Sequence, residues 1–151
     1  PCNERQSRKT NVRNHILIIL LLGLLLVPAG GAAAQDYSGQ WLGTITASLN
    51  RCENLGKAEP GDYKLTIVHK DGEILLMENV EQVPFRGVVN PRRPRNVHVQ
   101  GAYNDDGGYV TQVIEIVFAS AAEGEGQSVW NWSDGYHSCG GRFEFKLEKI
   151  R

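Results

Sequence analysis

The amino-acid sequence predicts an all-β domain, folded as an eight-stranded antiparallel up-and-down barrel, with a β sandwich as the alternative. Most of the chain after residue 34 consists of short segments in which apolar and polar residues alternate, the period typical of strands. Turn-forming residues separate these segments at intervals of about 8–12 residues, which is typical of sandwiches and barrels. The third observation is a pair of distant cysteines, Cys52 and Cys139, which a closed barrel would bring together.

The first 34 residues predict a secretory signal peptide. Basic residues precede a 12-residue apolar run, Ile16–Val27, and small residues follow it, so that cleavage is expected between Ala34 and Gln35. A transmembrane anchor is the alternative, but a span needs about 20 apolar residues and this run is shorter. We therefore expect a single domain, residues 35–151, with no membrane span after cleavage.

The charge of this expected domain argues against nucleic acid as a partner. Residues 35–151 contain 16 Asp and Glu against 12 Lys and Arg, a formal net charge of −4. Binding to a phosphate backbone requires a basic surface, which this composition does not favour.

The first strand is expected at Trp41–Leu49, where alternation predicts one half-buried face. Tyr63–Lys70 and Glu73–Asn79 follow as a hairpin. Asp71-Gly72 joins them, and both residues tolerate the positive φ that a two-residue hairpin turn requires. One face of the first strand would consist of Trp41, Gly43, Ile45, Ala47 and Leu49.

The second half of the domain is expected to hold five strands separated by polar turns. Pro84 cannot donate a hydrogen bond to a strand ladder, so it marks the start of a strand. Loops or turns are expected at Asn90–Arg95, Asn104–Gly108 and Ser120–Gln127. The strands are expected at Phe85–Val89, Asn96–Tyr103 and Tyr109–Ala119, followed by a closing hairpin within Val129–Leu147.

The positions of the two cysteines favour closure of the sheet. In an up-and-down barrel the loops after the first and seventh strands lie at the same end, and the first strand pairs with the eighth. Cys52 and Cys139 lie in those two loops, so a disulfide is expected. The chain-entropy model gives such a long loop about 4–5 kcal/mol of stabilisation at most. A disulfide also indicates an oxidising compartment, here the periplasm or the outside of the cell.

Ser38-Gly39-Gln40-Trp41 places a Gly-X-Trp motif at the start of the first strand, and an aromatic-rich strand ends the chain. In this the sequence resembles the calycin superfamily of lipocalins, fatty-acid-binding proteins and avidins. The resemblance implies an up-and-down barrel that holds a small apolar ligand. It also implies that Trp41 packs at the closed end against an arginine, for which Arg142 and Arg151 are candidates and Arg151 is better placed.

The same tetrapeptide, followed by a cysteine, also resembles the small periplasmic inhibitors of bacterial metalloproteases. Those proteins are eight-stranded barrels with one disulfide, and their N-terminal segment enters the protease cleft. This resemblance implies that Gln35–Ser38 would protrude from a filled barrel. The inhibitors carry both cysteines in the first half of the domain, whereas Cys139 lies near its end.

The sequence contains no pattern that predicts an enzyme, a metal centre or a bound cofactor. The histidines of the domain, His69, His98 and His137, show no ligand spacing, and a zinc site needs three or four converging ligands. No Gly-X-Ser-X-Gly elbow is present. Asp105-Asp106 is typical of a solvated turn.

Aromatic residues provide the remaining functional signal. Trp130 and Trp132 share one face of a strand and, together with Tyr103, are the candidate ligand-binding residues. An eight-stranded barrel is just wide enough either to fill with side chains or to hold one small ligand. The sequence therefore suggests a non-enzymatic binding module for a small apolar molecule. The alternative is a protein-binding inhibitor or an envelope interaction protein, with Arg92–Arg95 as a possible contact.

Overall fold

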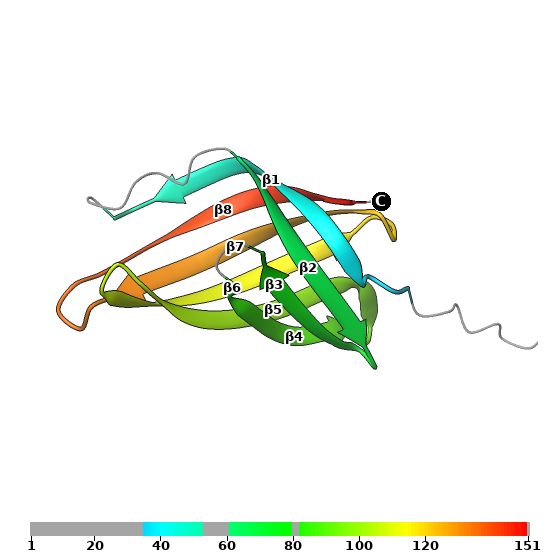
Figure 1. Cartoon of the computed structure of the whole chain (residues 1–151), viewed down its shortest axis with the longest axis horizontal. Coiled ribbons are helices and arrows are strands. Elements are labelled where there is room, and N and C mark those ends of the chain that lie inside the picture. Colours follow the sequence, from blue (N-terminus) through cyan, green and yellow to red (C-terminus); the bar gives the residue numbers. More distant parts are fainter. Residues whose placement is uncertain (1–34, 53–60, 80–81, 151) are drawn as a thin grey trace, which may run out of the picture. The chain divides into compact units, whose positions relative to one another are not determined.

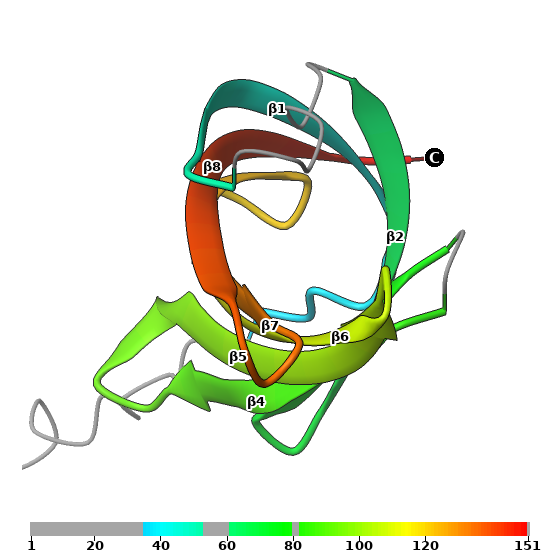
Figure 2. The ribbon, with the colours of Figure 1, turned by 90° about the vertical axis from the view of Figure 1, so that its left-hand side faces the viewer.

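The computed structural model describes residues 35–52, 61–79 and 82–150, and the expected signal peptide lies outside these ranges. The described chain is a closed eight-stranded antiparallel barrel, which confirms the predicted fold class (Figures 1 and 2). Each strand pairs with the next, and β8 pairs back with β1. No helix long and apolar enough to cross a membrane occurs in this part of the chain. The strands are β1 (Gly39–Asn50), β2 (Asp62–Lys70), β3 (Glu73–Glu78), β4 (Pro84–Asn90), β5 (Arg93–Asp105), β6 (Gly108–Phe118), β7 (Glu123–Ser133) and β8 (Ser138–Lys149).

Two expected loops are largely strand. Arg93-Pro94-Arg95 begins β5, and Pro94 is tolerated there because ladder pairing with β6 starts only at Asn96. The expected loop Ser120–Gln127 is shortened, because β7 already begins at Glu123. Its inward positions are Gly124 and Gly126, which carry no apolar side chain and so give no hydrophobic alternation in the sequence.

The expected inner face of the first strand is wrong beyond Ile45, because β1 contains a β-bulge there. Pairing with β8 shifts register between Ile45 and Ala47, so the inward and outward positions exchange beyond that point. Leu49, expected on the inner face, is 43% exposed. Asn50 faces the interior instead and lines the cavity described below.

A cluster of aromatic rings closes one end of the barrel, and we call this end the base. Trp41 is fully buried and pairs with Lys149 across the β1–β8 seam. The ring of Tyr37, also fully buried, stacks on Phe118 with centroids 3.9 Å apart. The indole N–H of Trp41 donates to the Tyr37 carbonyl oxygen at 3.0 Å. Tyr37 is therefore packed into the base, although Asp36 beside it is exposed, whereas the inhibitor resemblance implies that residues 35–38 protrude.

The cation beside Trp41 is a lysine. The Lys149 Nζ lies 5.6 Å from the centroid of the Trp41 ring, within the range of a cation–π contact. Arg142 pairs with Leu49 near the opposite end of β8, so it does not reach Trp41. Arg151, the other candidate, lies outside the described residues.

The opposite end of the barrel, which we call the rim, carries the expected disulfide. Cys52 and Cys139 are bonded, with their Cα atoms 5.2 Å apart. Cys52 follows β1 and Cys139 lies at the start of β8, so the bond ties the two strands of the closing seam at the rim. This bond is consistent with a location outside the cytoplasm.

We expect Trp41→Ala to destabilise the domain strongly. The change removes a fully buried ring from the base, and large-to-small substitutions of this kind cost about 3–5 kcal/mol. Because domains of this size are stable by only about 5–15 kcal/mol, the variant should melt far below the parent. Tyr136→Ala is the matched control, since Tyr136 is 95% exposed. Thermal melts of the two variants within a degree or two of each other would contradict a structural role for Trp41.

Candidate functional site

A cavity of about 530 Å³ opens at the rim of the barrel. The aromatic cluster of the base packs the interior at that end, whereas the cavity lining includes residues from the rim ends of the strands, the end of the barrel that faces the viewer in Figure 2. Toward the base the cavity lining is apolar and includes Leu76 and Ile114. Trp130, Trp132 and Tyr103, the three residues singled out in the sequence, all line this one cavity.

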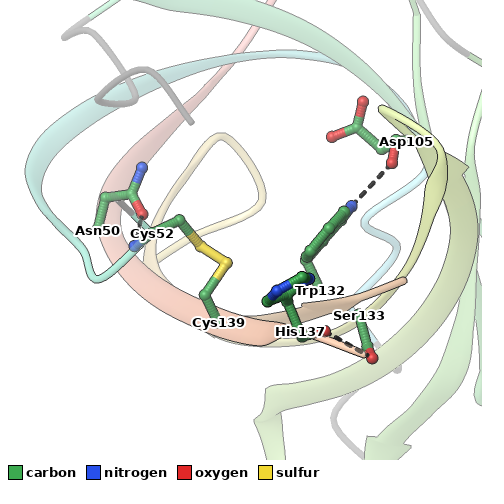
Figure 3. The surroundings of a disulfide bond; sticks show 7 residues. All are labelled: Asn50, Cys52, Asp105, Trp132, Ser133, His137 and Cys139. Carbon is green, nitrogen blue, oxygen red and sulfur yellow. Dashed lines mark hydrogen bonds between the residues drawn. A yellow bond between two sulfur atoms is a disulfide. The ribbon is translucent and has the colours of Figure 1, made fainter. Parts of the chain in front are cut away.

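The two tryptophans lie along the wall because the neighbouring strands offer glycines beneath them. A Cβ built on Gly141 would come within 2.7 Å of the Trp130 ring, and one on Gly108 would collide with the Trp132 ring. The Trp132 indole N–H also donates to the backbone carbonyl of Asp105 at 2.8 Å (Figure 3). This bond links the Trp132 side chain, which comes from β7, to the last residue of β5 across the intervening strand β6.

A chain of hydrogen bonds crosses the inner face of β5, β6 and β7. The Tyr103 hydroxyl donates to Gln112 Oε1 at 3.3 Å, and Gln112 Nε2 donates to Ser128 Oγ at 2.7 Å. Gln112 and Ser128 are only 8% and 0% exposed, so these bonds satisfy polar groups that would be costly to bury alone. Sequence reasoning missed both residues, although Gln112 lies on the same face of its strand as the inward-facing Val110 and Ile114.

Two carboxylates line the rim half of the cavity. Glu78 ends β3 and Asp105 ends β5, and both are at inward positions of their strands. They are the only members of the described lining that carry a formal charge at neutral pH. Tyr63 contributes a neutral hydroxyl, because burial raises its pKa well above the ordinary range of tyrosine. The sequence pattern indicated a turn residue at Asp105 and gave no signal at Glu78.

The β7–β8 loop beside the cavity is held by Asp134. Its Oδ1 accepts the backbone N–H groups of Tyr136 at 2.8 Å and His137 at 2.6 Å, and its Oδ2 lies 3.1 Å from His137 Nδ1. The His137 N–H, the His137 side chain and the Tyr136 N–H together lower the pKa of Asp134 to about 2. Ser133 Oγ donates to the His137 carbonyl at 3.0 Å and closes the turn (Figure 3).

The remaining candidate groups lie apart from the cavity and from one another. His69 lies near the base, 3.9 Å from Asp36, and His98 is on the outer surface, 3.7 Å from Glu115. Within residues 35–52, 61–79 and 82–150, no group of three metal-ligating side chains converges. Arg92–Arg95 lies at the β4–β5 connection, at the end of the barrel opposite the disulfide.

The chain matches no model of a known protein family, and comparison with curated proteins finds no relative. Assignment of a function therefore rests on the geometry of the cavity.

The Asp134 contacts predict a specific acid sensitivity of the loop. A carboxyl whose pKa is lowered by folding stabilises the folded state above its unfolded pKa, near 4, and loses that effect as the pH falls toward 2. Asp134→Asn should therefore lower the melting temperature most at pH 5–7, and the difference from the parent should shrink toward pH 2. Thermal melts over this pH range test the expectation, and a difference that does not vary with pH would contradict it.

Proposed function

We propose that this protein is an exported binding protein that holds a small apolar or amphiphilic molecule in the rim cavity of its barrel. The observation that carries the proposal is the 530 Å³ cavity walled by Trp130, Trp132 and Tyr103. Ligand pockets in proteins have volumes of about 300–1,000 Å³ and combine apolar walls with a few placed polar groups. The cavity fits both criteria.

The surrounding structure favours a preformed site. The disulfide ties the seam at the rim, and the aromatic cluster fixes the base. The hydrogen-bond chain from Tyr103 to Ser128 holds the wall formed by β5, β6 and β7. A rigid cavity loses little conformational entropy when a ligand enters, so more of the contact energy appears as affinity.

The proposed location is the periplasm or the outside of the cell. The disulfide favours an oxidising compartment, and the sequence of residues 1–34 predicts export. We propose binding without catalysis, because Gln112, the buried polar residue of the described cavity lining, is already hydrogen-bonded to Ser128 behind it.

The alternative, an inhibitor or interaction module that contacts another protein, has less support. That function would use a protruding segment at residues 35–38 or the basic segment Arg92–Arg95, most of which begins β5. The first segment is packed into the base through Tyr37, and Tyr37 also donates its hydroxyl hydrogen to the Pro94 carbonyl at 2.8 Å. The N-terminal segment and the basic segment are thus joined by a hydrogen bond.

A cavity-filling variant tests the proposal. Val110 is buried and lines the cavity, whereas Val113, on the same strand, faces outward and is 36% exposed. N-phenyl-1-naphthylamine, a neutral apolar dye, should fluoresce on binding to the parent protein. We expect Val110→Phe to weaken dye binding at least tenfold, because the ring occupies the cavity, while Val113→Phe binds the dye as the parent does.

Thermal melts of both variants establish that each is folded before the dye is added. If folded Val110→Phe binds the dye as tightly as the parent, the dye does not occupy the cavity. If the parent protein binds no dye at all, the proposed function is wrong.

A further inference from the structure

We propose that the cavity selects cationic amphiphiles, that is apolar molecules with a protonated amine, over neutral and anionic ones. This inference rests on the proposed function and specifies its ligand class. The observation behind it is that the charged residues in the described lining of a largely apolar cavity are all acidic. Glu78 and Asp105 line it, and no lysine, arginine or histidine belongs to the described lining.

The positions of the two carboxylates define where a cation would lie. Both occupy the last residue of their strands, at the rim, while the apolar side chains of Leu76 and Ile114 line the cavity nearer the base. A bound amphiphile would therefore direct its tail toward the base and its charged head toward the rim. The Asp105 side chain stands beside the Trp132 ring at this level (Figure 3).

Low-dielectric walls strengthen the discrimination. The field of a charge in a concave apolar site is screened less than it is at an open surface. Glu78 is partly buried in the cavity lining and Asp105 is exposed at its rim, so the weaker screening applies most to Glu78, while both carboxylates attract a cation and repel an anion. An anionic head group, such as that of a fatty acid, would find no cationic partner in the described lining. Burial of such an unpaired anion is unfavourable.

The aromatic walls act in the same direction. The faces of tryptophan and tyrosine rings carry negative electrostatic potential and attract organic cations. Trp130, Trp132 and Tyr103 line the cavity together with the two carboxylates. A neutral tail gains only apolar contact from these rings, whereas an ammonium group near the rim also gains the cation–π attraction.

Three ligands of equal chain length separate this inference from the proposed function. Octylamine, 1-octanol and octanoate should be titrated at pH 7 as competitors of the bound neutral dye. We expect octylamine to bind at least tenfold more tightly than octanol, and octanoate to bind more weakly than octanol. The preference for octylamine should decrease with added salt, because salt screens the attraction.

Charge-neutralising variants identify the residues. Glu78→Gln and Asp105→Asn should each reduce the octylamine-to-octanol affinity ratio severalfold, and thermal melts establish that each variant is folded before it is titrated. Asp106→Asn is the matched control, because Asp106 is the next residue along the chain and does not line the cavity. It should leave the ratio as in the parent.

The outcomes are distinct. Displacement of the dye by octanol, with octylamine no tighter or octanoate equally tight, would overturn the inference and leave the proposed function standing. The inference is also overturned if the Asp106 control lowers the ratio as much as Asp105→Asn. Failure of all three ligands and of the dye to bind would overturn the proposed function itself.

Discussion

The packing of aromatic rings on inward-facing glycines of neighbouring strands is the constraint on which this barrel depends. At these positions an added methyl group would collide with the ring, so each ring packs directly against the backbone of the adjacent strand. A ring over a glycine fits only in one register, because a shift by one residue exchanges inward and outward side chains. The pairs are Gly43 with Tyr63, Gly101 with Phe85, Gly108 with Trp132, Gly126 with Phe145 and Gly141 with Trp130.

This packing also determines where the interior is hollow. Around the rim the rings of Tyr63, Trp130 and Trp132 lie against the wall, so they enclose space without filling it. At the base the order is different, since Tyr37 and Phe118 stack on one another and Trp41 packs against Phe118 at 5.2 Å. Aromatic residues thus close the barrel at the base and line the cavity at the rim.

Sequence patterning predicted the strand order and the disulfide because both depend on local signals. Alternation, turn residues and the parity of the connections need no knowledge of distant contacts. The errors arose where a contact with a neighbouring strand decides the outcome. The bulge between Ile45 and Ala47 is a property of the β1–β8 pairing, and the strand at Glu123–Gln127 is stabilised by rings that cover Gly124 and Gly126.

The candidate site could likewise be predicted from the sequence only in part. Alternation placed Trp130 and Trp132 on one face, but it could not distinguish an open cavity from a packed core, because that depends on the glycines opposite them. Glu78 and Asp105 end β3 and β5, two strands that run in the same direction on either side of β4, so both carboxylates lie at one end of the sheet. Each is an ordinary strand-end carboxylate when the sequence is read locally. Because the barrel is closed, both carboxylates lie around the same largely apolar cavity, and the charged residues of its described lining are all acidic.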